Sequence, residues 1–356
     1  MMYVCDVAVR PIGREYSKST LDMALEVSSK VIDSCGEPEA IVFSTYASTF
    51  QEKFGNIAFA LAEALGLDAE TYEVRAGDGS GGAAIAVGTK LVKAGFKKVL
   101  VVGADKTNDF HSKHAVSHLR TLIQPYETIY GLTYSAVHAL AAKLYMKKYG
   151  VSHEDLLQWA VLMHDHATEV PHAQLKFQIN LKKALNGTIV SEPLNLFDSH
   201  PFSDGAAAVM ITSESAPVKI ETASATHVLS VSKRDLTFMY STKKAIERLG
   251  VDVESIEGFE VYDPFSIAGI IALESLGLAE RGEGLKVLDE MPNAINPSGG
   301  LKARGHPIGA TGVYQVAEGF LAVTEGLGKL GKVSTFLTHA TNLFGASTYL
   351  TLLKEV

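Results

Sequence analysis

The chain has 356 residues, of which 47% are hydrophobic and 20% are charged, so it can bury a large core. Its 32 basic and 40 acidic residues give a net charge of −8, and no basic stripe interrupts this balance, which argues against a nucleic-acid partner. The two cysteines, Cys5 and Cys35, are too few for a disulfide framework, and no apolar run approaches the roughly 20 residues that span a bilayer. With no signal-peptide pattern at the N-terminus, we expect a cytoplasmic protein without a membrane segment.

Short apolar runs alternate with longer segments of helical periodicity along the chain. Continuous apolar runs of this length are typical of strands that helices cover on both faces, so the sequence predicts an α/β protein. The expected strands are residues 40–47, 98–105, 206–213, 259–265 and 333–340. The expected helices between them include residues 20–34, 56–67 and 82–95.

Two stretches of the chain resemble each other. Residues 54–67 (FGNIAFALAEALGL) are similar to residues 265–278 (FSIAGIIALESLGL), with Glu63 and Glu274 at matching places. In each half the stretch is followed by a turn of small residues, a helix and a strand. This pattern predicts two copies of one βαβαβ-type unit.

A helix-rich segment, residues 117–184, lies between the two repeats. It contains two expected helices, at 132–150 and 153–168, and we expect an inserted lid or loop domain that contacts the ligand. The predicted boundaries are 1–116 for the N-terminal half, 117–184 for the loop domain, 185–214 for the end of the N-terminal half and 215–356 for the C-terminal half.

The glycine-rich stretch GDGSGG, residues 77–82, matches the Gly-x-Gly-x-x-Gly pattern of dinucleotide-binding loops, and Asp105 ends the next expected strand. Two features argue against a nicotinamide cofactor. The preceding stretch TYEVRA is polar for a central first strand, and the motif lies well inside the chain. A nicotinamide-dependent (NAD) oxidoreductase therefore stays a distant alternative.

A second glycine-rich stretch, NPSGGLKARGHPIGATG at residues 296–312, places His306 on a loop that enters a helix. The flanking Gly305 and Pro307 restrict the backbone, and the small neighbours leave the imidazole approachable. This composition favours a functional histidine over a merely structural one.

Three further histidines, His111, His114 and His118, share one face if their segment is helical, with His164 and His166 further along the chain. Three imidazoles can bind zinc, but no carboxylate or cysteine spacing completes a known site. We interpret them as surface or interface histidines and expect no metal.

Three motifs resemble those of one family, the thiolase superfamily. GHPIGATG, preceded by NPSGG, resembles the active-site histidine motif of thiolases and related condensing enzymes. Residues 193–211 resemble the stretch that closes the N-terminal half in that family, and residues 130–151 resemble the loop-domain helix of archaeal and sterol-carrier-protein-type thiolases. The resemblance spans nearly the whole chain. It implies a thiolase fold, in which two duplicated halves form α/β/α/β/α layers with an inserted helical loop domain.

The family uses a cysteine thiolate at a helix N-terminus to attack an acyl thioester. Where the family pattern is of the type VEAACASGG, this chain reads VRAGDGSGG, so the resemblance puts Asp78 at the position of the nucleophile. Where relatives have HDCF or NEAF, the chain has YDPF, which puts Tyr262 at the oxyanion-binding position. The resemblance thus implies Asp78, Tyr262 and His306 as the candidate catalytic residues.

The C-terminal motif that carries a second cysteine in other thiolases appears here as THATNLFGAS, residues 338–347, without a cysteine. The resemblance implies that Asn342 and Gly345 belong to the backbone that binds the oxyanion. It also implies that Gly305 and Ser203 contact coenzyme A.

An aspartate at a helix N-terminus caps free N–H groups and is a poor nucleophile, and its acyl product is a labile anhydride. The leading hypothesis is therefore an acyl-CoA-binding protein without ordinary thiolase (acetyl-CoA acetyltransferase) activity, one form of which is a subunit of a larger acyl-CoA assembly. The alternative is an acyl-CoA hydrolase or acyltransferase that uses Asp78, His306 and Tyr262. Neither needs a cofactor beyond coenzyme A or acyl-CoA as ligand.

The resemblance also implies partners. Thiolases are usually homodimers, and we expect the interface in residues 74–82 and 98–105. Archaeal-type thiolases assemble with an OB-fold protein and hydroxymethylglutaryl-CoA synthase, so these are candidate partners.

Overall fold

The structure is a computed structural model that describes residues 1–47, 55–109 and 111–356. Within these ranges, one sheet contains nine strands: β1 (Tyr3–Val9), β2 (Ala40–Ser44), β3 (Glu70–Val74), β4 (Lys98–Asp105), β7 (Gly205–Thr212), β8 (Val218–Thr226), β9 (Gly258–Glu260), β10 (Thr335–Asn342) and β11 (Ser347–Glu355). Their order is β3-β2-β4-β7-β1-β8-β11-β10-β9. The N-terminal and C-terminal halves of the sheet meet where β1 pairs with β8, through Tyr3 and Val4 alone.

The two halves of the sheet have the same topology. The run β2-β4-β7-β1 on one side matches β9-β10-β11-β8 on the other, and in each run the first pair is parallel and the rest are antiparallel. β3 adds a further parallel strand beside β2, and its counterpart is reduced to one parallel bridge between Phe259 and Ile295. The duplication predicted from the sequence is therefore confirmed in the topology.

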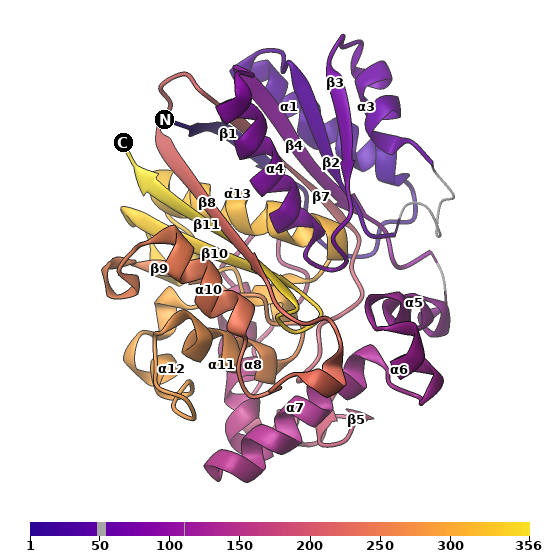
Figure 1. Cartoon of the computed structure of the whole chain (residues 1–356), viewed down its shortest axis with the longest axis vertical. Helices are drawn as coiled ribbons and strands as arrows, with labels where there is room; N and C mark the ends of the chain where they lie inside the picture. Colours follow the sequence, from indigo (N-terminus) through magenta and orange to yellow (C-terminus); the bar gives the residue numbers. More distant parts are fainter. Residues whose placement is uncertain (48–54, 110) are drawn as a thin grey trace.

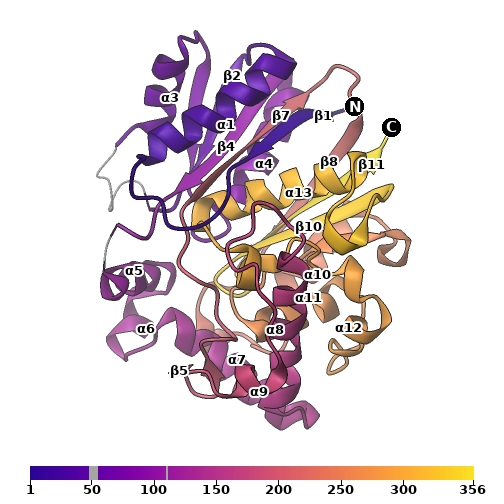
Figure 2. The ribbon, with the colours of Figure 1, turned by 180° about the vertical axis from the view of Figure 1, so that it is seen from behind.

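Helices lie outside and between the two halves. They are α1 (Thr20–Cys35), α3 (Ile57–Leu65), α4 (Ser80–Ala94), α10 (Tyr240–Leu249), α11 (Ser266–Leu276) and α13 (Thr311–Thr324). α1 and α3 cover the outer face of the N-terminal half, and α10 covers β8 and β11 on the other side. α4 and α13 each contact strands of both halves, so they form the middle of five layers (Figures 1 and 2). The layered fold class is as expected.

The helix-rich segment lies below the sheet in Figure 1. It contains α5 (Ser112–Leu119), α6 (Pro125–Ile129), α7 (Tyr134–Tyr149), α8 (His153–Ala167) and α9 (Leu181–Leu185), followed by the small hairpin of β5 (Ile189–Ser191) and β6 (Leu194–Asn195). α7 and α8 agree closely with the helices expected at 132–150 and 153–168. α8 begins with a capping box between Ser152 and Asp155, which fixes its first residue.

The sequence-based bounds differ most at β9. The expected strand 259–265 ends at Glu260, because the next residues leave the sheet and bond to side chains of distant segments. The Val261 N–H donates to Asn296 Oδ1 at 2.6 Å, and the Tyr262 N–H donates to His339 Nδ1 at 3.3 Å. Elsewhere the expected helices 20–34, 56–67 and 82–95 correspond to α1, α3 and α4, while Phe54, the first residue of the repeat, lies outside the described residues.

The two cysteines, Cys5 of β1 and Cys35 of α1, form one disulfide. The expectation that residues 98–105 lie in a dimer interface is wrong. β4 lies between β2 and β7 with residues 99–105 buried, so 98–105 cannot form a dimer interface, whereas β3 is the edge of the sheet. Among the described residues, no helix is long and apolar enough to cross a membrane.

Candidate functional site

The two central helices approach each other at glycines. A Cβ atom on Gly81 would lie 2.5 Å from the backbone nitrogen of Gly312, and a Cβ on Gly312 would lie 2.2 Å from that of Gly82. Only glycine allows this contact, because backbone atoms cannot move aside. The contact brings the residues that precede α4 and α13, among them Asp78 and His306, to one place.

The same contacts explain the glycine pattern of residues 77–82 without a dinucleotide. A Cβ on Gly77 would lie 2.2 Å from Asn342 Oδ1, and one on Gly79 would lie 3.1 Å from the Asn342 nitrogen. The strand before the loop, β3, is the sheet edge rather than its centre. These glycines pack against the second half of the molecule, so the pattern does not favour a nicotinamide cofactor.

Asp78 is buried, with 1% of its surface exposed. Its Oδ2 accepts a hydrogen bond from the Tyr134 hydroxyl at 2.7 Å, and its Oδ1 accepts one from the Leu343 N–H at 2.9 Å. Burial raises the pKa of Asp78 to about 6, although both hydrogen bonds pull it down. The carboxyl group is therefore close to a protonation change at neutral pH.

The expectation that Asp78 caps α4 is wrong. The residue at the helix N-cap is Gly79, and no side chain accepts a hydrogen bond there. The carboxyl group points instead to the turn after β10, where the Leu343 N–H meets it. Desolvation of the Asp78 carboxyl group at this place disfavours its charged form. A carboxylate that caps a solvent-exposed helix end would not be desolvated in this way.

The turn after β10 has an unusual backbone. Leu343 and Phe344 have φ angles of 38° and 54°, in the left-handed region that costs residues with a side chain roughly 1–3 kcal/mol each. The Arg234 guanidinium supports the turn by donating to both carbonyl oxygens, at 3.0 and 3.1 Å. This conformation directs the Leu343 N–H at Asp78.

The two residues expected to provide oxyanion binding from this turn behave differently. Asn342 has a buried Oδ1 without a hydrogen-bond partner among the described residues. Gly345 has a φ of 79°, and its carbonyl oxygen accepts from Ser241 Oγ at 2.7 Å. The N–H that reaches the carboxyl group belongs to Leu343, which the sequence did not single out.

Tyr262 and His306 complete a chain of hydrogen bonds to Asp78, and each is 1% exposed. The Tyr262 hydroxyl donates to the carbonyl oxygen of Asp78 at 2.6 Å and lies 3.3 Å from His306 Nε2. Because the carbonyl can only accept, the proton of Tyr262 points there, and His306 Nε2 must donate to the Tyr262 oxygen. His306 Nδ1 then accepts from Thr311 Oγ1 at 2.7 Å. Burial lowers the pKa of His306 well below its usual value, so the ring is neutral.

Ser203 and Gly305 hold His306 in place. Ser203 Oγ accepts from the His306 N–H at 2.8 Å and donates to Gln174 Oε1 at 2.6 Å. Gly305 has a φ of 112°, and a Cβ there would lie 2.5 Å from Ile12. The contacts of both residues are with protein groups, beside the cavity described next.

A cavity of about 840 Å³ lies against this cluster. Tyr134, His200 and Phe265 belong both to its lining and to the surroundings of Asp78 and His306. Most of the remaining lining is apolar and comes from the N-terminal half and the helix-rich segment: Ile12, Val116, Leu119, Leu175, Val190, Leu196, Pro201 and Phe202. A ligand in the cavity would meet Tyr134 and His200 before it met the buried groups behind them.

His200 is a site residue that the sequence motifs did not reveal. The centroids of the His200 and His306 rings are 4.5 Å apart, and the rings meet edge to face. His200 Nδ1 lies 2.9 Å from the Pro201 carbonyl oxygen. Burial lowers the pKa of His200 to about 4. The signal that could have found it is the His-Pro pair ahead of the small residues 203–208, the same composition that identified His306.

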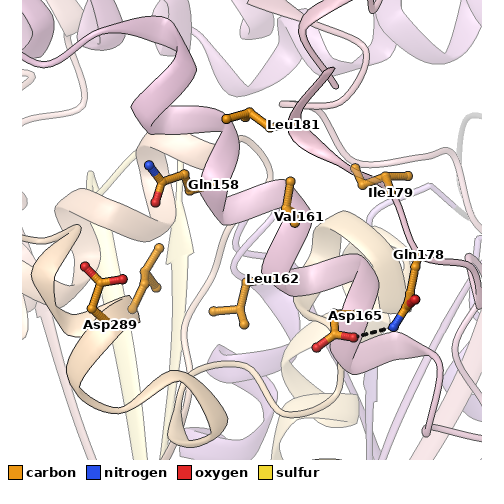
Figure 3. A pocket seen from close by; sticks show the side chains of 9 residues that line it. Gln158, Val161, Leu162, Asp165, Gln178, Ile179, Leu181 and Asp289 are labelled. Atoms are coloured by element: carbon orange, nitrogen blue, oxygen red, sulfur yellow. Dashed lines mark hydrogen bonds between the residues drawn. The ribbon is translucent and has the colours of Figure 1, made fainter. Parts of the chain in front are cut away.

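The other candidate sites have fewer side chains that could act as an acid, a base or a nucleophile. A pocket of about 490 Å³ on α8 (Figure 3) is lined by Leu162, Ile179 and other residues, and its Asp165 accepts from Gln178 Nε2 at 2.8 Å and from Lys329 at 2.5 Å. It contains neither histidine nor cysteine. His114 and His118 lie on α5, and no group of three His, Cys, Asp or Glu side chains in the described ranges could hold a metal.

The duplicated five-layer fold, with two central helices that meet at a shared site, defines the class of the protein as thiolase-like. Residues 222–355 match the family model "Thiolase C-terminal domain-like". The chain is 31% identical over 341 residues to an acetyl-CoA acetyltransferase of Methanothermobacter thermautotrophicus, an alignment that covers 88% of each protein. The chain therefore belongs to the thiolase family.

Two solved structures share the whole fold. One, described as "Ltp2-ChsH2(DUF35) aldolase", has a TM-score of 0.83 and 21% identity, and the match covers 99% of this chain and 97% of the other. The second is the Acat5 thiolase from Ascaris suum in complex with coenzyme A, with a TM-score of 0.75, 18% identity and full coverage of both chains.

Proposed function

We propose that this protein binds an acyl-CoA in the cavity beside His200 without forming an acyl-enzyme intermediate. The observation that carries the proposal is Asp78, a buried carboxyl group directly before α4, where the family resemblance puts the nucleophilic cysteine. The two cysteines of the chain are bonded to each other in β1 and α1. Without a thiolate, the covalent step of thiolysis has no nucleophile.

Several features agree with an acyl-CoA ligand. The relative from Methanothermobacter thermautotrophicus is named an acetyl-CoA acetyltransferase, and the Acat5 thiolase binds coenzyme A in its structure. The cavity is lined mostly by apolar side chains, is large enough for an acyl group with part of the pantetheine arm, and ends at His200, whose ring packs against His306. No cofactor other than the ligand is part of the proposal.

The assembly is also part of the proposal. The exposed edge of β3 makes the N-terminal half suitable for a homodimer. The name of the aldolase neighbour joins it to a DUF35 protein, which supports a role for this chain as a subunit of a larger acyl-CoA assembly. We retain an OB-fold protein and hydroxymethylglutaryl-CoA synthase as candidate partners, a cytoplasmic location, and the division into two halves with a loop domain at 117–184.

One observation favours a second candidate, non-covalent proton-transfer chemistry. With its pKa raised to about 6, Asp78 can accept a proton near neutral pH, as a general base must. Beside it, Tyr262 and His306 form a chain of donors. Such a site is suitable for hydrolysis or transfer of an acyl group. Because one structural neighbour is named an aldolase, cleavage of a carbon–carbon bond is a further candidate reaction. Tyr134 would have to swing aside to admit substrate to Asp78.

Isothermal calorimetry with acetyl-CoA and coenzyme A tests the proposal. We expect saturable binding of both ligands by the wild type, with no condensation product (acetoacetyl-CoA) in the calorimeter cell after the titration with acetyl-CoA. Asp78→Asn separates the two candidates, since it should bind like the wild type and should abolish any hydrolysis or transfer that depends on the carboxyl group. Absence of binding at millimolar ligand would overturn the proposal and favour a structural role in an assembly.

A further inference from the structure

The inner end of the cavity contains an unused hydrogen-bond acceptor. His200 Nδ1 lies 2.9 Å from the Pro201 carbonyl oxygen, and a carbonyl only accepts, so Nδ1 carries the proton. With its pKa lowered by burial to about 4, the ring is neutral at pH 7 and its Nε2 has a free lone pair. In the described part of the chain, no group is hydrogen-bonded to this nitrogen, and it is not sealed from the cavity.

The neighbouring histidines are not available in this way. His306 Nε2 is engaged with Tyr262, as described above. His138 also has Nδ1 fixed, 2.9 Å from the Tyr134 carbonyl oxygen, but its Nε2 is sealed among aromatic rings, with Phe265 stacked on it at 4.5 Å. His200 is therefore the histidine whose acceptor a ligand in the cavity can reach.

The position of His200 tells which part of a ligand would meet it. Its ring touches that of His306 at the end of the cavity nearest Asp78. In the proposed function the thioester lies at this end, so the first acyl carbons, rather than the amides of the pantetheine arm, lie beside His200. The side chains of Phe202 and Phe265 in the lining are apolar, and Gln174 Oε1, an acceptor elsewhere in the lining, already accepts from Ser203 Oγ at 2.6 Å.

We propose that the cavity selects acyl-CoA ligands with a hydroxyl group on the carbons next to the thioester, and that His200 Nε2 accepts the hydrogen bond of this hydroxyl. The inference rests on the proposed function and adds the substrate class, a hydroxyacyl-CoA. A plain alkyl chain would leave the lone pair of a buried imidazole unpaired, which costs binding free energy.

The test compares matched ligands that differ only in the hydroxyl group. Dissociation constants of butyryl-CoA, 2-hydroxybutyryl-CoA and 3-hydroxybutyryl-CoA are measured by calorimetry with the wild type, His200→Phe and His200→Gln. The wild type should bind one of the hydroxylated ligands about three- to tenfold more tightly than butyryl-CoA, the range of one neutral hydrogen bond. His200→Phe should remove this preference, so that the three ligands bind to that variant with dissociation constants that agree within about threefold. His200→Gln, whose amide retains an acceptor, should keep part of it.

Each other outcome overturns the inference or its basis. If the wild type binds all three ligands equally, no acyl hydroxyl is hydrogen-bonded to His200. The same conclusion follows if His200→Phe weakens the binding of all three equally, and that result would indicate that His200 contacts the pantetheine amides instead. If His200→Phe binds none of the three ligands, the result with His200→Gln tests the inference instead. Complete loss of the preference for hydroxylated ligands in His200→Gln would then count against the inference. Failure of the wild type to bind any of the ligands would instead overturn the proposed function.

Discussion

At the scale of single residues, the central feature is Asp78, a buried carboxyl group that forms no ion pair with any of the residues that the structure describes. Asp78 receives hydrogen bonds from Tyr134 and Leu343, and these lower its pKa, but desolvation is the larger effect and leaves it at about 6. The folded protein therefore disfavours the charged form relative to the unfolded chain, in which aspartate has a pKa of about 3.9.

The linked change in stability can be measured. A group whose pKa is raised by folding contributes most to the free energy of unfolding below its unfolded pKa. For Asp78 this contribution is lost as the pH rises toward 6 and beyond. Asp78→Asn removes the charge and keeps an acceptor for Leu343, so it should raise the free energy of unfolding at pH 7.5 by up to roughly 3 kcal/mol, the equivalent of a shift of about two pKa units. Denaturant unfolding at pH 7.5 and at pH 4 checks this. At pH 4 the variant should show little gain, and a loss at pH 7.5 would contradict the account.

The residues that the sequence revealed and those that it missed differ in a physical way. Asp78, Tyr262 and His306 stand in local motifs with glycine or proline neighbours, and the structure brings them together. Tyr134 reaches Asp78 from the start of α7, and the Leu343 contribution is a backbone N–H set by an unusual φ angle. Neither a distant helix end nor a backbone direction has a sequence pattern of its own.

At the scale of elements, the contact of α4 with α13 positions the whole site. Gly81 meets the backbone of Gly312, where no side chain can yield. Because Asp78 and His306 precede these two helices, any widening of the contact separates them.

This contact predicts a large effect of one methyl group. Gly81→Ala should lower the free energy of unfolding by about 3 kcal/mol or more, since overpacking against backbone cannot be relieved by rotamer changes. Gly13→Ala is the control, because nothing lies within 4 Å of a Cβ there and its φ is ordinary, so its effect should stay within about 0.5 kcal/mol. Thermal unfolding of both variants checks the pair. Equal stability of Gly81→Ala and Gly13→Ala would show that the helices can move apart freely.

Secondary structure was predictable where it depends on local periodicity. α7 and α8 differ from the expected helices by at most two residues at either end. β9 is shorter than expected because Asn296 and His339 bond to the N–H groups of Val261 and Tyr262, and these partners come from elsewhere in the chain. The disulfide between Cys5 and Cys35 likewise depends on how α1 packs against β1.

At the scale of the whole molecule, the cavity is a shared product of its parts. Its lining combines Ile12 near the first strand, Leu175 from the helix-rich segment and Phe265 from the C-terminal half. The duplication accounts for the central helices and the site between them, whereas the inserted segment supplies one part of the cavity wall, including Leu119, Tyr134 and Leu175. Ligand preference can therefore change through the insert without a change in the layered core.

The most direct test of the account is whether the protein becomes acylated. Wild type and Asp78→Cys are incubated with acetyl-CoA and then freed of it, because acetyl-CoA is itself a thioester that hydroxylamine converts to a hydroxamate. One portion is analysed by intact-protein mass spectrometry without hydroxylamine, and a second is treated with hydroxylamine to trap an anhydride and assayed for hydroxamate. We predict an unmodified wild type that yields no hydroxamate, and a cysteine variant that carries one acetyl group. An acetylated wild type, or hydroxamate formed from it, would contradict the claim that the site binds acyl-CoA without a covalent intermediate.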